Sequence, residues 1–500
     1  MRLEAYTVRD VVTFPKAGLT GRRKIMLPID EINRGNVEDV LSKALAVHAL
    51  NAGEITYLYN YFKGSQDIRD KVKLVREEIN NIVTINRASE IVAFKTSYLL
   101  SEPVQYIAHG GDDRVSDNVN TLNEFMRLED KESHDKEIVD WMHICGVAER
   151  MVLTDEMAGA DDGAPFYIYT LDPREAFCIY SSKLGKKKLA GVILQQDDDE
   201  KWFATVYTDK WCFKVYSDGN VSEEPHYLGG IPLIEYLNNE ARIGAFEPVI
   251  PILNAINQLE SDAVDSVQDF VNAFDVFANC EIDKETYAGL SVGNSAVKIK
   301  TITPGIEAKV YRVSSEINQT GVQTRVDDLT ESYLTICGMP NRNGGLSTSD
   351  TGSAVIYRDG FVAAHARAVD TATMFRRSEK EFDRIVLNIC KAKKKLDLSI
   401  SEFEPKFPLG NLTNIQSLTQ IFVELLNQPF VHPKVAYEVG SGLFKDPETA
   451  YRMSEEWYNK NLEDQETQLN GEIERERAKA VRSVRQDDSS AEQESGIKTA

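Results

Sequence analysis

The side chains that could carry chemistry in this sequence are chiefly carboxylates. Several occur between Ile243 and Asp283, a stretch without lysine or arginine, and they include Glu247, Glu260, Asp262, Asp265, Asp269 and Asp275. Carboxylates act as catalysts or metal ligands when their spacing brings them together with suitable partners. The sequence holds no H-E-x-x-H, paired C-x-x-C or EF-hand pattern. We therefore expect no catalytic residues, no cofactor and no metal site.

Two other groups could be metal ligands but have simpler interpretations. His143 and Cys145 are the only close His/Cys pair, and the other cysteines are scattered. We interpret His143 as a half-buried histidine and the cysteines as reduced, buried small side chains. The acidic run 197–200 has no second ligand segment, so we expect a solvated hairpin turn there.

The acidic stretch has the periodicity of a long helix. At roughly 100° per residue, Asp262, Asp265 and Asp269 share one arc. The apolar residues on a separate arc are Ile252, Ile256, Leu259, Ala263, Val267, Phe270 and Phe274. Pro248 suits a first turn, so we expect a helix over 246–279, about 30 residues and ~45 Å long. An ordinary helical hairpin in a core fits this spacing equally well.

The composition is that of an acidic chain with several sub-domains. Five hundred residues exceed one usual hydrophobic core, and 42% hydrophobic residues are typical of a globular protein. The formal net charge of −22 argues against clamping nucleic acid, but not against a passage through which DNA moves. No apolar run reaches the roughly 20 residues that span a bilayer, and the first residues are charged. We expect the protein in a cytoplasm or in a particle assembled there, without a membrane partner.

The remaining pattern is α+β and mainly helical, with antiparallel strands between 147 and 236. The expected helices outside the acidic stretch are 37–50, 87–100, 117–127, 135–145, 319–340, 353–395, 414–426 and 446–458. The helix over 353–395 is expected to bend at Gly360. A polar, glycine-rich loop over 341–352 precedes it, and the chain past about Arg485 has a disordered composition.

Several short segments, in order from about residue 55 to 395, resemble the portal proteins of long-tailed bacteriophages, especially those of phages of Bacillus and related hosts. The segments are Tyr61-Phe62-Lys63-Gly64, Gln66-Asp67-Ile68, Asn86-Arg87, Lys95 to Pro103, Cys145 to Ala148, Leu171 to Phe177, Pro232 to Asn239, Asp269 to Ala273 and Gly352-Ser353-Ala354. The first fifty residues and the tail depart from the family's pattern.

The resemblance implies an α+β, mainly helical portal fold with regions called wing, stem, clip and crown, assembled as a ring of twelve subunits. The implied layout is wing at 1–245, first stem helix at 246–279, clip at 280–318, second stem helix at 319–340, tunnel loop at 341–352, a long wing helix and strand at 353–409, crown at 410–485 and a disordered tail at 486–500. DNA would touch the tunnel loop at Asn343, Gly344, Gly345, Leu346, Ser347, Thr348, Ser349 and Asp350. The acidic stripe of Asp262, Asp265 and Asp269 would line the bore.

A ring of this kind has room for DNA. Twelve helices ~10 Å apart define a circle ~38 Å across and leave a bore of ~28 Å, wider than a duplex of roughly 20 Å. The resemblance implies a structural subunit at one capsid vertex of the virion, assembled in the host cytoplasm, through which DNA is packaged and ejected. The implied partners are identical subunits, double-stranded DNA, the terminase large subunit, a head-completion or adaptor protein, and a major capsid or scaffolding protein.

Two other functions remain open at this point. The first is a scaffold or capsid-associated interaction protein that uses the same helices only to assemble and has no DNA channel. The second is a nucleic-acid-processing enzyme whose site is assembled from distant carboxylates.

Overall fold

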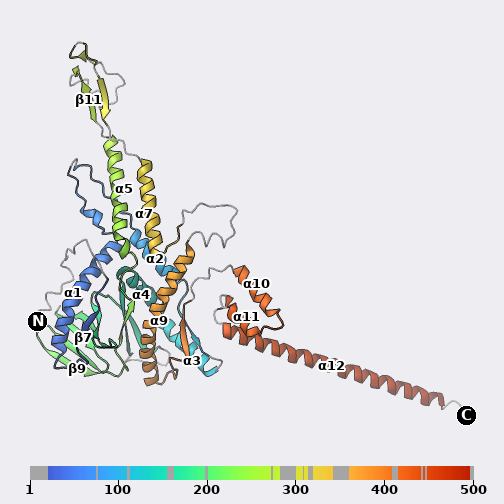
Figure 1. Ribbon diagram of the computed structural model, residues 1–500. Coiled ribbons are helices and arrows are strands. Elements are labelled where there is room, and N and C mark those ends of the chain that lie inside the picture. The colour runs from blue at the N-terminus through green and yellow to red at the C-terminus, as the bar shows by residue number, and fades with distance from the viewer. Residues whose placement is uncertain are drawn as a thin grey trace. The chain divides into compact units, whose positions relative to one another are not determined.

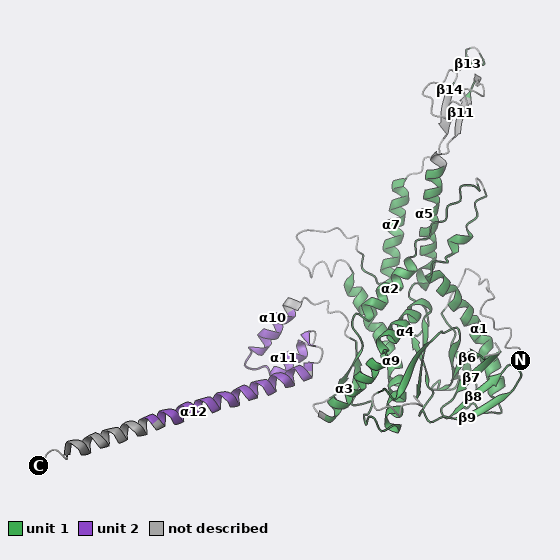
Figure 2. Ribbon diagram, turned by 180° about the vertical axis from the view of Figure 1, so that it is seen from behind, with its two compact units in different colours: residues 1–410 green, residues 411–500 purple. Residues whose placement is uncertain are grey.

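The computed structural model divides the chain into two units, residues 1–410 and 411–500 (Figure 2). It describes all residues except 1–20, 75–76, 110–112, 155–162, 198–200, 272–273, 282–299, 304, 308, 314–318, 342–359, 408–414, 441–442, 445–446 and 496–500. The tunnel-loop residues 343–350 therefore lie outside the described part, as does the acidic run's larger part, 198–200.

The expected N-terminal helices are confirmed. They are α1 (Val37–Phe62), α2 (Arg87–Leu99), α3 (Asp113–Leu128) and α4 (Lys131–Cys145). Helix α1 continues well past Leu50, where the apolar pattern is broken by Asn51 and Glu54. Both of these polar residues are buried because they bind Arg23 and Arg22, which lie far away in the sequence. The sequence pattern missed the second half of α1 for this reason.

The strands form two main sheets in the first unit. The larger has the order β1-β5-β6-β7-β8-β9, in which β1 is parallel to β5 and the other pairs are antiparallel. Its strands are β1 (Ile25–Leu27), β5 (Ala176–Ser181), β6 (Lys188–Gln196), β7 (Trp202–Tyr207), β8 (Trp211–Tyr216) and β9 (Val221–Pro225). The smaller, β10-β3-β4, consists of Leu233–Leu237, Val147–Thr154 and Phe166–Leu171. This is the antiparallel region that the period-two pattern predicts.

The acidic helix is shorter than expected. After a 3-10 turn, η3 (Glu247–Val249), helix α5 runs over Ile250–Val271. Phe274, expected on the apolar arc of the helix, lies instead in strand β11 (Phe274–Ala278), which pairs antiparallel with β14 (Lys309–Val313). Strand β11 pairs with a partner strand more than thirty positions later, so the sheet overrides the helical pattern. A second small pair joins β12 (Cys280–Glu281) and β13 (Lys300–Thr301).

Helix α7 (Gln319–Cys337) returns beside α5, as the view in Figure 1 shows. Its Val326 and Tyr333 are buried as the spacing predicts, whereas Ile336 is 49% exposed. Helix α9 (Phe361–Ala392) follows, and Gly360 is its N-cap in the left-handed conformation, φ +82°. Gly360 therefore precedes the first residue of the described helix, and residues 353–359 of the expected helix lie outside the described part. Strand β15 (Phe403–Lys406) then pairs with β2 (Gln105–Ala108).

The second unit contains α10 (Ile415–Leu426), α11 (Pro433–Val439) and α12 (Pro447–Ser495). An aromatic cluster of Phe422, Tyr437 and Phe444 joins the shorter helices, with ring centroids 5.0 to 5.2 Å apart. Helix α12 continues to Ser495, so the expected disorder past Arg485 is wrong for residues up to Ser495. No glycine or proline interrupts the chain between Gly471 and Gly496, and its many glutamate, arginine and alanine residues favour helix.

Candidate functional site

The α5–α7 pair is held to the body of the first unit by an apolar face and a buried ion pair. Leu253 and Ile256 of α5 are buried together with Tyr333 of α7. At the base of α5, Arg22 Nη2 lies 2.6 Å from Glu247 Oε1, and both side chains are almost fully buried. Apolar packing and this ion pair therefore hold the base of α5 in place, which suits a rigid helix pair.

A polar face of α5 is covered by residues 66–74 and 77–85, which lie beside the helix on the side away from α7 (Figures 1 and 2). The amide N–H groups of Val83 and Ile85 donate to Ser261 Oγ and Asn257 Oδ1, at 3.0 and 2.9 Å. Asn254 Nδ2 donates to Asp67 Oδ2 at 2.9 Å. The positions on α5 repeat every three or four residues, so they form one helical face that faces the chain itself and not solvent.

Asp265 is the centre of this contact. Its Oδ1 accepts the backbone and side-chain N–H groups of Asn81 at 2.7 and 2.8 Å, and its Oδ2 accepts Lys71 Nζ at 2.9 Å. Burial by itself would raise the pKa of Asp265, but the hydrogen bonds from Asn81 and Lys71 outweigh it and lower the pKa to about 2. The residue is only 3% exposed. The expectation of an open acidic stripe is wrong at Asp265, because residues from another segment cover and neutralise it.

The other two residues of the expected stripe differ from Asp265. The Asp262 side chain is 52% exposed, and it too contacts Lys71 Nζ, at 2.9 Å. The side chain of Asp269 lies outside the described part of the chain. Of the predicted carboxylates, Asp262 is thus the one that the structure places at the surface.

Helix α7 carries exposed carboxylates that the sequence reasoning did not single out. Asp327, Asp328 and Glu331 are all exposed, and Asp327 accepts a hydrogen bond from Gln323 at 2.8 Å. The expectation concentrated on the stretch without basic residues, and Arg325 excludes α7 from such a search. A search for charged residues opposite the apolar positions Val326 and Tyr333 finds them.

The ends of the tunnel-loop segment are described although the loop itself is not. Helix α7 stops at Cys337, and Gly338 has φ +65° with its N–H bonded to the Thr335 carbonyl. A cavity of about 190 Å³ lies here between α2 and α7, lined by Arg87, Glu90, Phe94, Thr330, Tyr333, Leu334, Met339, Pro340 and Asn341.

Helix α9, at the other end of that segment, is anchored by a buried ion cluster. Glu379 accepts from Arg150 Nη1 at 2.8 Å and from Tyr236 at 2.7 Å, and lies 3.2 Å from Lys131 Nζ. Asp135 pairs with both cations. The four charged side chains of the cluster are each at most 4% exposed. The cluster fixes α9 to β3, β10 and α4.

A second buried carboxyl joins this cluster. Tyr106 lies 2.8 Å from Asp383 and 3.0 Å from Glu379. Burial, followed by the negative charge of Glu379, raises the pKa of Asp383 well above its usual range. The raised pKa favours the neutral form of Asp383, while Arg150 and Lys131 each pair with Asp135 and Glu379.

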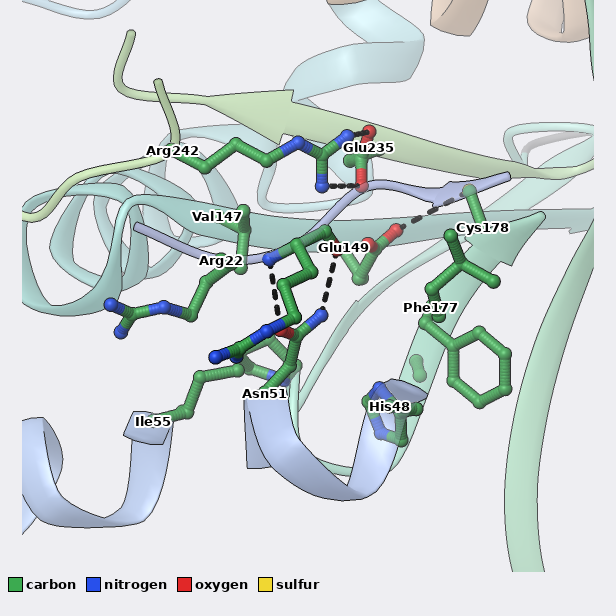
Figure 3. Close-up of a pocket in the computed structure, with 14 residues that line it drawn as sticks. Arg22, His48, Asn51, Ile55, Val147, Glu149, Phe177, Cys178, Glu235 and Arg242 are labelled. Carbon is green, nitrogen blue, oxygen red and sulfur yellow. Dashed lines mark hydrogen bonds and ion pairs between the residues drawn. The ribbon is translucent and has the colours of Figure 1, made fainter. Parts of the chain in front are cut away.

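The pocket in Figure 3 is an internal polar cavity of about 20 Å³, room for roughly one water molecule. Arg242 donates to both oxygens of Glu235, at 2.8 and 2.7 Å, and Asn51 exchanges hydrogen bonds with the Arg23 backbone. Burial lowers the pKa of His48 to about 4. His48 Nε2 contacts the Arg174 carbonyl oxygen at 2.7 Å, and the space is too small for a substrate.

The His143 and Cys145 pair lies in the core. Cys145 Sγ contacts the carbonyl oxygens of Trp141 and Val147 at 3.3 and 3.2 Å, and burial raises the pKa of its thiol to about 12. His143 is 2% exposed, more buried than expected, and burial lowers its pKa to about 3. Among the described residues, no three His, Cys, Asp or Glu side chains are grouped so that they could hold a metal ion.

Of the helices in the described part of the chain, none combines the length and the apolar character needed to cross a lipid bilayer.

Comparison with known proteins shows which family the sequence matches. Residues 41–465 match the family model described as "Phage portal protein, SPP1 Gp6-like". A search of curated proteins with this sequence finds no match. Among solved structures, one similar chain comes from "Neck of empty GTA particle computed with C6 symmetry". It is 6% identical with a TM-score of 0.41, and the match covers 71% of this chain and 89% of the other.

Proposed function

This chain belongs to the SPP1 Gp6-like family of phage portal proteins, and we propose that its copies form a ring whose axial channel conducts double-stranded DNA. Membership makes it a structural component of a phage capsid. The resemblance in its short segments and the family match both cover residues 246–340, which supports our proposal that the α5–α7 pair is the stem. The number of subunits, twelve, is part of the proposal.

The observation that carries the channel proposal is the set of exposed carboxylates on the α5–α7 pair. Asp262, Asp327, Asp328 and Glu331 are exposed, whereas Leu253 and Ile256 of α5 and Val326 and Tyr333 of α7 are buried. Carboxylates turned towards DNA would repel its phosphates and prevent a tight grip, which suits a wall past which DNA must slide. In this proposal, α7 contributes three of these four exposed carboxylates to the channel wall and α5 contributes one.

The tunnel loop 341–352 is the proposed point of closest contact with DNA. Its flanks support this role, because Gly338 and Gly360 both adopt left-handed conformations where the helices end and begin. Asn343, Gly344 and Gly345 would offer backbone and amide groups, and Ser347 to Ser349 would offer hydroxyl groups. Such groups contact phosphates without the strong attraction of lysine or arginine.

The strand pairs β11–β14 and β12–β13 are the proposed clip, now beginning near Phe274 and not at Cys280. We propose that the terminase large subunit docks there during packaging and a head-completion or adaptor protein afterwards. ATP hydrolysis would belong to the terminase, and this chain would act as a passive conduit. Assembly in the host cytoplasm with a major capsid or scaffolding protein completes the proposal.

Negative-stain images of the purified chain test the channel. We expect rings with an axial hole of about DNA width and a countable number of subunits. Particles without an axial hole would refute the channel and favour a scaffold or other capsid-associated protein.

Deletion of residues 343–350 tests the tunnel loop separately. We expect rings to form as in the wild type, while DNA packaging or retention is impaired. Normal packaging by the deletion variant would refute the role of the loop and leave the ring itself unaffected.

A further inference from the structure

The strap is defined here as residues 71–74 and 77–83, and it places two apolar side chains in solvent. Val72 is 78% exposed and Leu74 is 86% exposed. The neighbouring Lys71 and Lys73 point the other way, with side chains 8% and 25% exposed, and both lie near Asp265. An extended segment alternates its side chains, and here the charged ones face inward while the apolar ones face outward.

The strap holds this arrangement firmly. Lys73 Nζ donates to the Ile79 carbonyl and Asn80 Nδ2 donates to the Lys71 carbonyl, both at 3.0 Å, so the two limbs of the strap are joined. Ile79 is 2% exposed and packs inside. Lys71 and Asn81 bind Asp265 on α5. Since its own bonds fix the strap to α5, Val72 and Leu74 cannot turn inward without breaking those bonds.

From this arrangement we propose that Val72 and Leu74 form part of the contact between neighbouring copies of this chain. The inference rests on the proposed ring. A cyclic ring joins two different patches of each subunit, and both patches must lie at the same height along the ring axis. The strap contacts α5 at Asp262 and Asp265, so it lies beside the stem helix, where identical copies are closest together.

Two molecules could lie next to the stem in the proposed ring, a second copy of this chain and DNA. Val72 and Leu74 suit the second copy better. Phosphates carry charge and gain nothing from Val72 or Leu74, whereas burying each side chain in a protein contact is favourable. The helix pair also exposes apolar residues at the height of the strap. Val264 and Val267 are 42% and 52% exposed, and they lie about 100° and about 160° around α5 from Asp265. The strap and these valines are therefore on different sides of the stem, as a cyclic contact requires.

Leu74→Asp tests the contact in the full-length protein, because it adds a charge to a residue that is 86% exposed in the single chain. We expect at least a tenfold rise in the protein concentration needed for half-maximal ring formation, measured by mass photometry. Leu184→Asp is the matched control, since Leu184 is fully exposed and lies in the β5–β6 turn, away from the strap. Hydrogen exchange at Asn81 should stay slow in Leu74→Asp, which shows that the strap is still folded.

A photo-crosslinking residue, p-benzoylphenylalanine, at position 72 identifies the partner. We expect covalent ladders at multiples of the chain mass of 56.2 kDa after irradiation of rings. Adducts confined to one chain, adducts only with DNA or another virion protein, or unchanged ring formation by Leu74→Asp would each refute the inference while the ring stands. Absence of rings from the wild-type protein would refute both the inference and the proposed function.

Discussion

Replacing Asp265 by asparagine removes the charge that holds the strap to α5. The carboxylate accepts hydrogen bonds from Lys71 Nζ and from two N–H groups of Asn81, all between 2.7 and 2.9 Å. An asparagine keeps the shape but brings an N–H₂ group towards these donors, and it removes one of the two carboxylates that lie 2.9 Å from Lys71 Nζ. The variant should therefore open the strap without unfolding the rest of the unit.

The size of the effect follows from the pKa of Asp265. Its fall from 3.8 to about 2 corresponds to about 2 kcal/mol at ~1.4 kcal/mol per unit. We therefore expect Asp265→Asn to destabilise the closed strap by about 2–3 kcal/mol. Because ~1.4 kcal/mol is a factor of ten, the backbone amides of Asn81 and Val83 should exchange with solvent roughly 30- to 150-fold faster.

Hydrogen exchange followed by mass spectrometry measures this opening. Asp262→Asn is the control, because its half-exposed side chain is screened by water and its loss should cost under about 1 kcal/mol. Equal protection of the strap in Asp265→Asn and the wild type would refute the reasoning. So would equal losses in the two variants, since burial would then have no influence on the strength of the pair.

Further predictions concern acid, the buried cluster and two glycines. Asp265 has a lower pKa in the folded protein than in the unfolded one, so its stabilisation is complete above about pH 4 and is lost as the pH falls towards about 2. Protection of the strap amides against hydrogen exchange should decline in that window. A decline centred near pH 6 would point to another group. Arg150→Met leaves Asp135 and Glu379 short of a buried cation and should lower the free energy of unfolding by about 3–5 kcal/mol in urea titrations, while a loss under about 1 kcal/mol would contradict this reasoning. Gly146→Ala should lower the melting temperature or prevent soluble folding, because φ is +85° and the new Cβ would lie 2.3 Å from the Arg242 carbonyl oxygen. Gly471→Ala is the control, because a Cβ at this position in α12 meets open space. Alanine should stabilise the helix by about 1 kcal/mol, which circular dichroism would detect as a higher helix content.

Local periodicity predicted much of the fold. Helices α2 and α4, strands such as β6 and β7, and the return helix α7 all lie where their apolar spacing indicates. These elements bury one face against a core, so their apolar residues recur at regular intervals along the sequence. The pattern failed where polar residues are buried, as at Asn51 and Glu54 of α1, and where a distant partner strand was needed, as at Phe274.

The candidate site was less accessible to sequence reasoning. The search for a stretch without basic residues found Asp262 but overlooked Asp327, Asp328 and Glu331, which have Arg325 nearby. The buried cluster of Arg150 and Glu379 was also missed, because its members come from separate helices and strands. Charged residues in apolar strands, such as Arg150 in β3, are the signal that could have indicated it.

The sequence by itself determined the family, the amphipathic character of α5 and the presence of carboxylates opposite its apolar face. Only the tertiary structure decided which of those carboxylates remain open to a passing molecule. Asp265 and Lys71 are 194 positions apart, and a helical wheel describes one helix without the segments that cover it. The charge of a side chain is local information, whereas its exposure depends on the whole fold.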